Sequence, residues 1–98
     1  MNQLKLVASI LEKSALRYSP AGIPIANAIL VHSSMQIQAG VERQVEMEIA
    51  VLAAGEISKS FLAIELGQVQ EFTGFLARKN RNSKSLVFHI TEFKNVEA

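Results

Sequence analysis

The segment from Ile25 to Val31 constrains the fold more than any other part of the sequence, because it is apolar on both faces apart from Asn27. Its run of aliphatic residues follows a turn-rich stretch and predicts a β-strand. A strand that is apolar on both faces is usually covered on both. We therefore expect one face to line the interior of a barrel and the other to lie against another element or a second subunit.

Four other segments are also predicted strands. They are Leu4–Leu11, Gln44–Ala53, Gln68–Arg78 and Leu86–Phe93. Alternation of apolar residues with a period of two supports Leu4–Leu11, the first half of Gln44–Ala53, and Leu86–Phe93. The first of these strands has one fully apolar face, made of Leu4, Leu6, Ala8 and Ile10.

Turn and loop residues separate the strands. Ser19–Pro24 contains both prolines and Gly22, and predicts a turn before the doubly apolar strand. The stretch from Ser33 to Arg43 is polar and contains Gly40, which predicts a long hairpin loop.

Glycines and apolar spacing also define the second half of the chain. Ile57, Phe61 and Ile64 lie at helical spacing between two glycines and favour a short amphipathic helix. The alternative is that Phe61–Leu66 extends toward the next strand. Gly74, inside the fourth predicted strand, suggests a bulge or a sharp bend.

Five strands with a short helix between the third and the fourth match the OB-fold, a small Greek-key barrel that binds single-stranded nucleic acid or oligosaccharide. The length of 98 residues leaves room for one domain. Residues 1–98 are therefore predicted to form a single all-β domain, a five-stranded OB-fold barrel.

Composition excludes several other classes of protein. A hydrophobic content of 49% with 19% charged residues excludes intrinsic disorder. The sequence contains no apolar run long enough for a transmembrane helix and no signal-peptide pattern. It has no cysteine, which excludes disulfides, thiolate metal sites and cysteine nucleophiles. We expect a cytoplasmic protein without a membrane anchor.

The net charge of +1 conceals an uneven distribution. Four of the ten Lys and Arg residues fall within seven positions, leaving six against the nine acids of the chain; the four are Arg78, Lys79, Arg81 and Lys84. A basic loop on a slightly acidic body would attract a polyanion to one place. The simpler interpretation is a solvated, flexible hairpin tip.

The residues needed for catalysis or metal binding are missing. The chain has no aspartate, and His32 and His89 lie on different predicted strands, where each is expected to form a local hydrogen bond. Glu46 and Glu48 share a strand face, but nothing beside them would separate their pKa values for acid–base work. We predict that the protein is not an enzyme and needs neither a metal nor a cofactor.

Specific sequence motifs then resemble a known family. Leu16–Ser34 reads LRYSPAGIPIANAILVHSS, which is similar to the second-strand region of bacterial single-stranded DNA-binding proteins. The pattern His-x-Ser-x-Gln-x-x-Ala-Gly-x-x-Arg-Gln over residues 32–44 resembles that of the primosomal replication protein N (PriB) family, spacing included. Gly67, Gly74-Phe75 and Leu86-Val87-x-His89 fit the same family.

The resemblance implies a homodimeric OB-fold that binds single-stranded DNA. It also implies contact with the PriA helicase, and with a primosomal loader protein, during restart of stalled replication forks. The family uses basic side chains at positions held here by Arg17, by Arg43 and by the four cations of the basic loop, and we predict these residues as the DNA site. Tyr18 is the remaining candidate for base stacking.

Two aromatic residues that the family carries on its DNA face are absent, since Val41 and Glu46 stand at those positions. Stacking of a base on an aromatic side chain contributes ~1–3 kcal/mol. We therefore expect weaker and more salt-sensitive binding than is usual for the family. The five phenylalanines, at positions 61, 72, 75, 88 and 93, are predicted to lie in the core.

Two other interpretations remain open. In one, the protein is mainly a helicase-interacting adaptor, and its DNA binding is secondary. In the other, the OB-fold binds an anionic protein segment or an oligosaccharide. For the dimer, we predict that the first strand, with Leu4, Leu6, Ala8 and Ile10, pairs between subunits.

Overall fold

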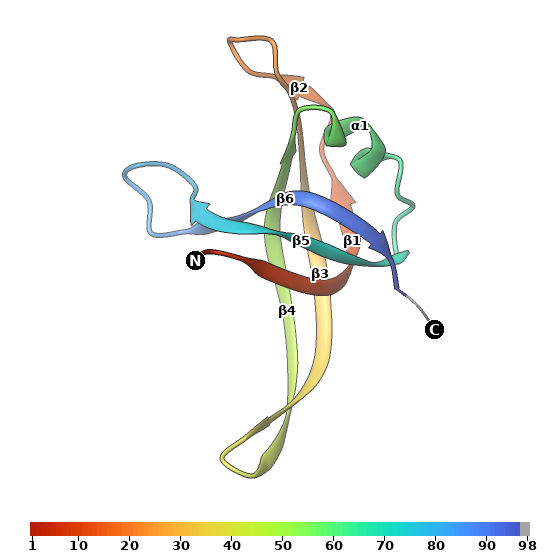
Figure 1. Cartoon of the computed structure of the whole chain (residues 1–98), viewed down its shortest axis with the longest axis vertical. Coiled ribbons are helices and arrows are strands. Elements are labelled where there is room, and N and C mark those ends of the chain that lie inside the picture. Colours follow the sequence, from red (N-terminus) through yellow and green to blue (C-terminus); the bar gives the residue numbers. More distant parts are fainter. Residues whose placement is uncertain (97–98) are drawn as a thin grey trace.

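The computed structural model describes residues 1–96 of the chain and confirms the OB-fold barrel (Figure 1). The elements, in order, are β1 (Leu4–Lys13), β2 (Arg17–Tyr18), β3 (Pro24–Gln38), β4 (Val41–Ala54), α1 (Ile57–Leu62), β5 (Val69–Arg78) and β6 (Leu86–Asn95). The strands lie in the order β1-β5-β6-β4-β3-β2, and pairing of β1 with β3 closes the barrel. The short helix lies where it was expected, between β4 and β5. Within residues 1–96, no helix is long and apolar enough to span a membrane.

β1 closes the barrel by changing partners halfway along its length. Leu4–Ser9 pair with β5, and from Ser9 to Lys13 the strand pairs with β3. A bulge at the change of register, between Ile10 and Glu12, allows this turn from one neighbour to the other. The side chains of Leu6, Ala8 and Ile10 are buried in the chain's own core.

The two faces of β3 are covered differently. Ala26, Ala28 and Leu30 point into the barrel and are at most 5% exposed. The alternate residues Asn27 and Ile29 point outward and are only half-buried. The expectation of a barrel-lining face is therefore confirmed, whereas the outer face is left partly open in the single chain.

The helix packs an aromatic cluster into the core. Phe61 on α1 is fully buried, with its ring centroid 6.0 Å from that of Phe72 and 6.3 Å from that of Phe93 in edge-to-face geometry. Edge-to-face contacts of this kind add roughly 0.5–1.5 kcal/mol beyond the area that they bury. Ile57 and Ile64 pack against the same core.

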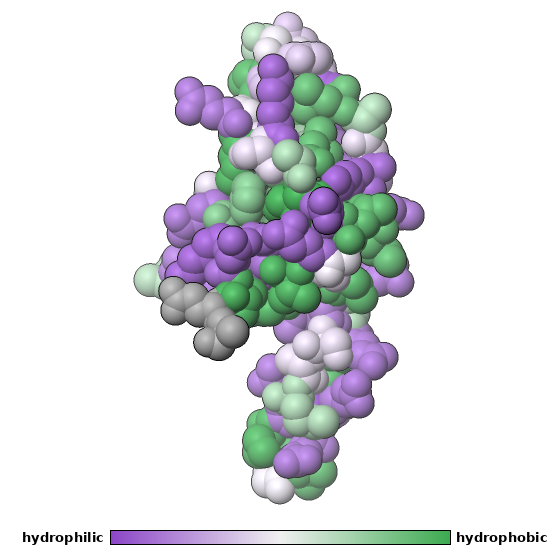
Figure 2. Space-filling model, turned by 90° about the vertical axis from the view of Figure 1, so that its right-hand side faces the viewer, coloured by the Kyte–Doolittle hydropathy of each residue, from purple (hydrophilic) through white to green (hydrophobic). Residues whose placement is uncertain are grey.

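The prediction of a long hairpin loop over Ser33–Arg43 is wrong. β3 and β4 pair without interruption from Ile25↔Ala54 to Gln38↔Val41, and only Ala39 and Gly40 connect them. Both connecting residues have positive φ, 53° and 77°, as a two-residue hairpin turn requires. The paired ends project from the barrel as a two-stranded arm, residues 33–48 (Figures 1 and 2). The β3 half of the arm is rich in serine and glutamine and is largely exposed on both faces, so it carries no buried apolar face that would identify it as a strand.

A bulge where β5 pairs with β6 changes the side-chain pattern. The register shifts between Thr73 and Gly74, so that Thr73 lies opposite Glu92 and Gly74 lies opposite Ile90. The bulge predicted at Gly74 is thus confirmed. The skipped residue, Thr91, donates a hydrogen bond from its hydroxyl to the Thr73 carbonyl oxygen at 3.2 Å.

The prediction that all five phenylalanines lie in the core is wrong for Phe75. Its side chain is 39% exposed and stacks on His89, with the ring centroids 4.8 Å apart and the planes 9° from parallel. His32, by contrast, is buried and hydrogen bonded as expected. Its Nδ1 donates to the Val7 carbonyl oxygen at 2.6 Å, and its Nε2 is hydrogen bonded to the Ser34 hydroxyl at 2.8 Å.

Candidate nucleic-acid interface

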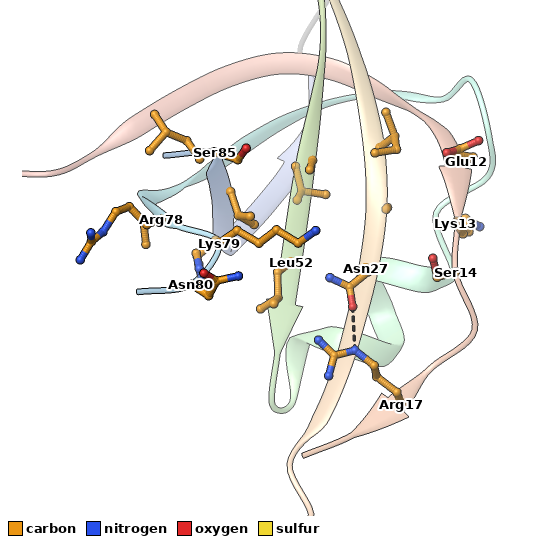
Figure 3. Close-up of a pocket in the computed structure, with 18 residues that line it drawn as sticks. Glu12, Lys13, Ser14, Arg17, Asn27, Leu52, Arg78, Lys79, Asn80 and Ser85 are labelled. Atoms are coloured by element: carbon orange, nitrogen blue, oxygen red, sulfur yellow. Dashed lines mark hydrogen bonds between the residues drawn. The ribbon is translucent and has the colours of Figure 1, made fainter. Parts of the chain in front are cut away.

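An open groove of about 970 Å³ lies on the outer face of β3 and β4 (Figure 3). Its floor consists of outward-facing residues of these two strands: Asn27, Ile29, Ala50 and Leu52. The end of β1 and the start of β2 form one side, and the β5–β6 loop with the start of β6 forms the other. In an OB-fold, this strand face between two loops is where oligonucleotides and oligosaccharides bind.

Positive charge is concentrated along the sides of the groove. Four cationic residues line it, Lys13, Arg17, Arg78 and Lys79, against the single acid Glu12. Within residues 1–96, the ion pairs are those of Glu71 with Lys5 and with Lys94, so none of the four cations is neutralised by a salt bridge. The Lys13 Nζ donates a hydrogen bond to the Leu62 carbonyl oxygen at 2.8 Å, so its charge is held toward α1. Cations without ion pairs beside a largely apolar floor suit a ligand that carries phosphates and flat, partly apolar rings.

Asn27 orients one of these cations. The Arg17 Nε donates a hydrogen bond to the Asn27 Oδ1 at 2.9 Å. The bond uses only one of the five N–H donors of the guanidinium, which leaves the terminal nitrogens free for a phosphate. In Figure 3, Arg17 and Lys79 lie on opposite sides of Leu52, whereas the guanidinium of Arg78 points away from both.

Internal hydrogen bonds connect the residues of the basic β5–β6 loop, most of which are exposed. The Lys79 N–H donates to the Ser85 carbonyl oxygen at 2.8 Å and closes the loop at its base. Asn80 accepts two backbone N–H groups, through its side chain and its carbonyl oxygen. The Arg78 guanidinium donates to the Arg81 carbonyl oxygen at 3.1 Å.

The structure brings together part of the predicted DNA site. Arg17, Arg78 and Lys79 line the groove, and Arg81 and Lys84 are exposed on the loop beside it. Lys13 and Asn27 also line the groove but were missed by sequence reasoning. Asn27 carried a signal, because it is the one polar residue in an otherwise apolar strand, but Lys13 is identified only by the register of β1 against β3.

Tyr18 lies outside the groove. It follows Arg17 on β2, so the two side chains leave the strand on opposite faces. The ring is 60% exposed.

Arg43 lies near the tip of the arm, away from the groove. Its Nη1 donates to the Gln38 Oε1 at 2.8 Å. By strand alternation it shares a face with Val51 and Ala53, which are buried in the barrel, and not with the groove residues Ala50 and Leu52.

The face of the arm that continues the groove floor is acidic. Glu42, Glu46 and Glu48 have the same strand parity as Ala50 and Leu52, and all three are exposed. Opposite them on β3 lie Ile37, Ser33 and Val31. The electrostatic character of this continuous face therefore changes from basic at the groove to acidic along the arm.

Comparison with known proteins agrees with this geometry. Residues 2–92 match a family described as another single-strand binding protein family. The replication restart protein PriB of Nitrosomonas europaea is 38% identical over 91 residues, which cover 93% of this chain and 84% of that protein. The protein of the same name from Bordetella pertussis is 34% identical and covers 98% of this chain and 90% of its own length.

Solved structures give the same result. PriB from Ralstonia solanacearum has a TM-score of 0.91 and 41% identity, with 99% of both chains covered. The single-stranded DNA-binding protein from Thermus aquaticus has a TM-score of 0.75 at 20% identity, covering this chain fully and 51% of that one, which supports the fold alone.

Barrel, groove and sequence together define a small OB-fold protein of the single-strand binding class. Within that class, the chain belongs to the replication restart protein PriB family.

Proposed function

We propose that the protein is a nonenzymatic, cytoplasmic accessory factor of replication restart, which binds single-stranded DNA in the groove and stimulates a PriA helicase at stalled forks. The names of its relatives support the role in replication restart. The observation that carries DNA binding is the set of four cations without salt bridges that line an open groove with one acid. We propose that phosphate contacts by Arg17, Arg78, Lys79, Arg81 and Lys84 supply most of the affinity.

The acidic arm favours a second candidate function, a helicase-binding adaptor in which DNA binding is secondary. Three glutamates on the groove-side face of the arm repel a DNA backbone, and Val41 at the start of β4 offers no ring for stacking. DNA would then be limited to the groove, and the arm would remain accessible to a protein partner, such as the helicase or a loader protein.

We also propose that β1 forms a homodimer through its free edge. Over Leu4–Ala8, the strand pairs with β5 on one side and has no strand on the other within residues 1–96. Since Leu6, Ala8 and Ile10 fill the chain's own core, pairing with a second copy would use the backbone of this edge rather than those side chains. Two copies would present two grooves to one DNA strand and add avidity.

A salt titration tests the proposed function. Binding of fluorescent oligo-dT by the wild type is measured across a range of NaCl concentrations, beside a variant with Arg78, Lys79, Arg81 and Lys84 changed to alanine. Three to five phosphate contacts predict a slope of log affinity against log salt of roughly −2 to −3.5. The variant should lose most of the binding and show a shallower slope.

Two other outcomes would count against parts of the proposal. Equal binding by the variant and the wild type would show that the loop is not the DNA site. No binding by the wild type at low salt would overturn the DNA-binding proposal and favour the adaptor.

A further inference from the structure

One row of neighbouring residues crosses the sheet from the groove to an exposed aromatic pair. Asn27 on β3 lies opposite Leu52 on β4, and Leu52 is in register with His89 on β6. His89 in turn lies opposite Phe75 on β5. Neighbouring strands are ~4.8 Å apart, so the row runs roughly 14 Å across the outer face. With Arg17 hydrogen bonded to Asn27, it begins at a cation and ends at two stacked rings.

The aromatic pair differs from the other aromatic residues of the barrel. Phe61, Phe72 and Phe88 are fully buried, and Phe93 packs against the core. Phe75 is 39% exposed, and its partner His89 lines the groove. The two rings lie almost parallel, so each covers one face of the other and Phe75 keeps part of its surface in solvent.

The backbones of β5 and β6 set the position of the Phe75–His89 pair. The β5–β6 register shift directly precedes Gly74, and a Cβ at Gly74 would collide with the carbonyl oxygen of His89. The close approach of the two backbones at Gly74 therefore sets the position of Phe75 next to His89. Bulges often re-aim side chains in this way beside binding sites.

We propose that the Phe75–His89 stack is a platform for one nucleobase of the bound strand. This inference rests on the proposed function and adds a stacking contact to its phosphate contacts. It also gives the protein a surface for base stacking, although Val41 and Glu46 stand at the two positions where the family carries aromatic residues. The DNA would cross the strands along the row, with a phosphate near Arg17 and a base beyond Leu52 on the two rings.

The test compares wild type with Phe75→Leu, on oligo-dT and on an abasic oligonucleotide of equal length. Loss of one stacking contact should weaken binding of oligo-dT about fivefold to a hundredfold. The salt slope should stay the same, because no phosphate contact is removed. On the abasic strand, the two proteins should bind equally, and Phe75→Tyr should restore binding of oligo-dT. A thermal melt of Phe75→Leu shows whether it is folded.

A fluorescent reporter gives an independent readout, because the chain contains no tryptophan. In Phe75→Trp, the single indole should be quenched on addition of oligo-dT and much less by the abasic strand. Leu66→Trp is the matched control. Leu66 is 60% exposed and lies outside the groove, so quenching there should be weak.

The outcomes separate this inference from the proposed function. If Phe75→Leu binds oligo-dT as tightly as the wild type, the platform proposal is wrong, and the proposed DNA-binding function still stands. No binding by the wild type would overturn both. If sedimentation shows that the wild type is a dimer and that Phe75→Leu is a monomer, Phe75 belongs to a protein interface. This result would also overturn the platform proposal.

Discussion

A guanidinium group binds a phosphate with the least loss of entropy when its orientation is already fixed, and the Asn27 side chain holds Arg17 in this way. The family resemblance pointed to Arg17 and Arg43 alike as basic DNA-site positions. The fold separates them, because Arg17 lines the groove and Arg43 lies on the arm, on the face opposite the groove side. Their contributions to DNA binding should therefore differ.

We predict that Arg17→Ala weakens binding of oligo-dT and reduces the salt slope by about 0.7, the value for one phosphate contact. Arg43→Ala removes the same charge and is the matched control, with affinity expected within about twofold of wild type because a distant exposed charge is screened. Fluorescence anisotropy over a salt series measures both quantities. Equal losses in the two variants would show that net charge, rather than the groove, governs binding.

The glutamates of the arm should act in the opposite direction. Changing Glu42, Glu46 and Glu48 to glutamine removes three charges that repel the DNA backbone from the face that continues the groove. Because the residues are exposed, we expect a gain of roughly 1 kcal/mol in binding at low salt, which fades as salt is added. Titrations at two salt concentrations measure the effect. Weaker binding of the variant would mean that the arm helps to bind the strand.

At the scale of elements, the sequence predicts the barrel and the helix well, because buried strands carry clear apolar alternation and α1 presents Ile57 and Phe61 at helical spacing. Residues 33–43 of the arm escape prediction because they bury neither face, so only the backbone pairing from β3 to β4 defines them. Phe75 escapes for a different reason. It lies three residues after the buried Phe72, and the residue skipped in the β5–β6 register is Thr91 on β6, so uninterrupted alternation along β5 places the two rings on opposite faces. The general tendency of phenylalanine to be buried outweighed this alternation in the prediction.

The same logic holds for the groove. Four cations and Asn27 come together from β1, β2, β3, the end of β5 and the β5–β6 loop. The cluster of basic residues in that loop is local in the sequence and was found from it. Lys13 reaches the groove only because β1 pairs with β3, and this pairing of distant segments is visible in the structure but not in the sequence.

Gly74 gives a stability prediction at this scale. Gly74→Ala places a Cβ against the backbone carbonyl of His89, which cannot move without disturbing the β5–β6 pairing. We expect the free energy of unfolding to fall by roughly 3 kcal/mol, at the upper end for an overpacked site. Urea denaturation followed by circular dichroism measures the change.

Gly67→Ala separates the steric cost from the conformational cost. A Cβ at Gly67 meets no atom within 4 Å, but its φ is +82°. The expected loss in the free energy of unfolding is about 1 kcal/mol, because only backbone strain is introduced. Equal losses for the two variants would contradict the close backbone approach at Gly74.

At the scale of the whole molecule, the oligomeric state depends on whether a second copy pairs with the free edge of β1. In an antiparallel strand, the N–H and C=O of one residue point to the same edge of the strand, and this edge alternates from each residue to the next. The Val7 carbonyl oxygen faces His32, away from β5, so the N–H groups of Lys5 and Val7 also face the free edge. These groups are the donors available to a second copy.

We predict that Lys5→Pro removes one of these donors and shifts the protein from dimer to monomer at micromolar concentration, while the pairing of β1 with β5 is kept. Lys5→Ala is the control, since it loses the same exposed ion pair with Glu71 but keeps its N–H. Analytical ultracentrifugation measures the oligomeric state, and circular dichroism verifies the fold. A wild-type protein that is monomeric, or a Lys5→Pro variant that remains dimeric, would contradict pairing at this edge.

The central claim, that single-stranded DNA lies in the groove between β2 and the β5–β6 loop, is tested most directly by a backbone amide NMR titration with oligo-dT. We predict that the largest shift changes occur at Lys13–Arg17, Asn27, Leu52 and Lys79–Leu86, with the tip of the arm at residues 36–43 nearly unchanged. Shift changes concentrated at the tip of the arm, with the groove unaffected, would contradict the claim.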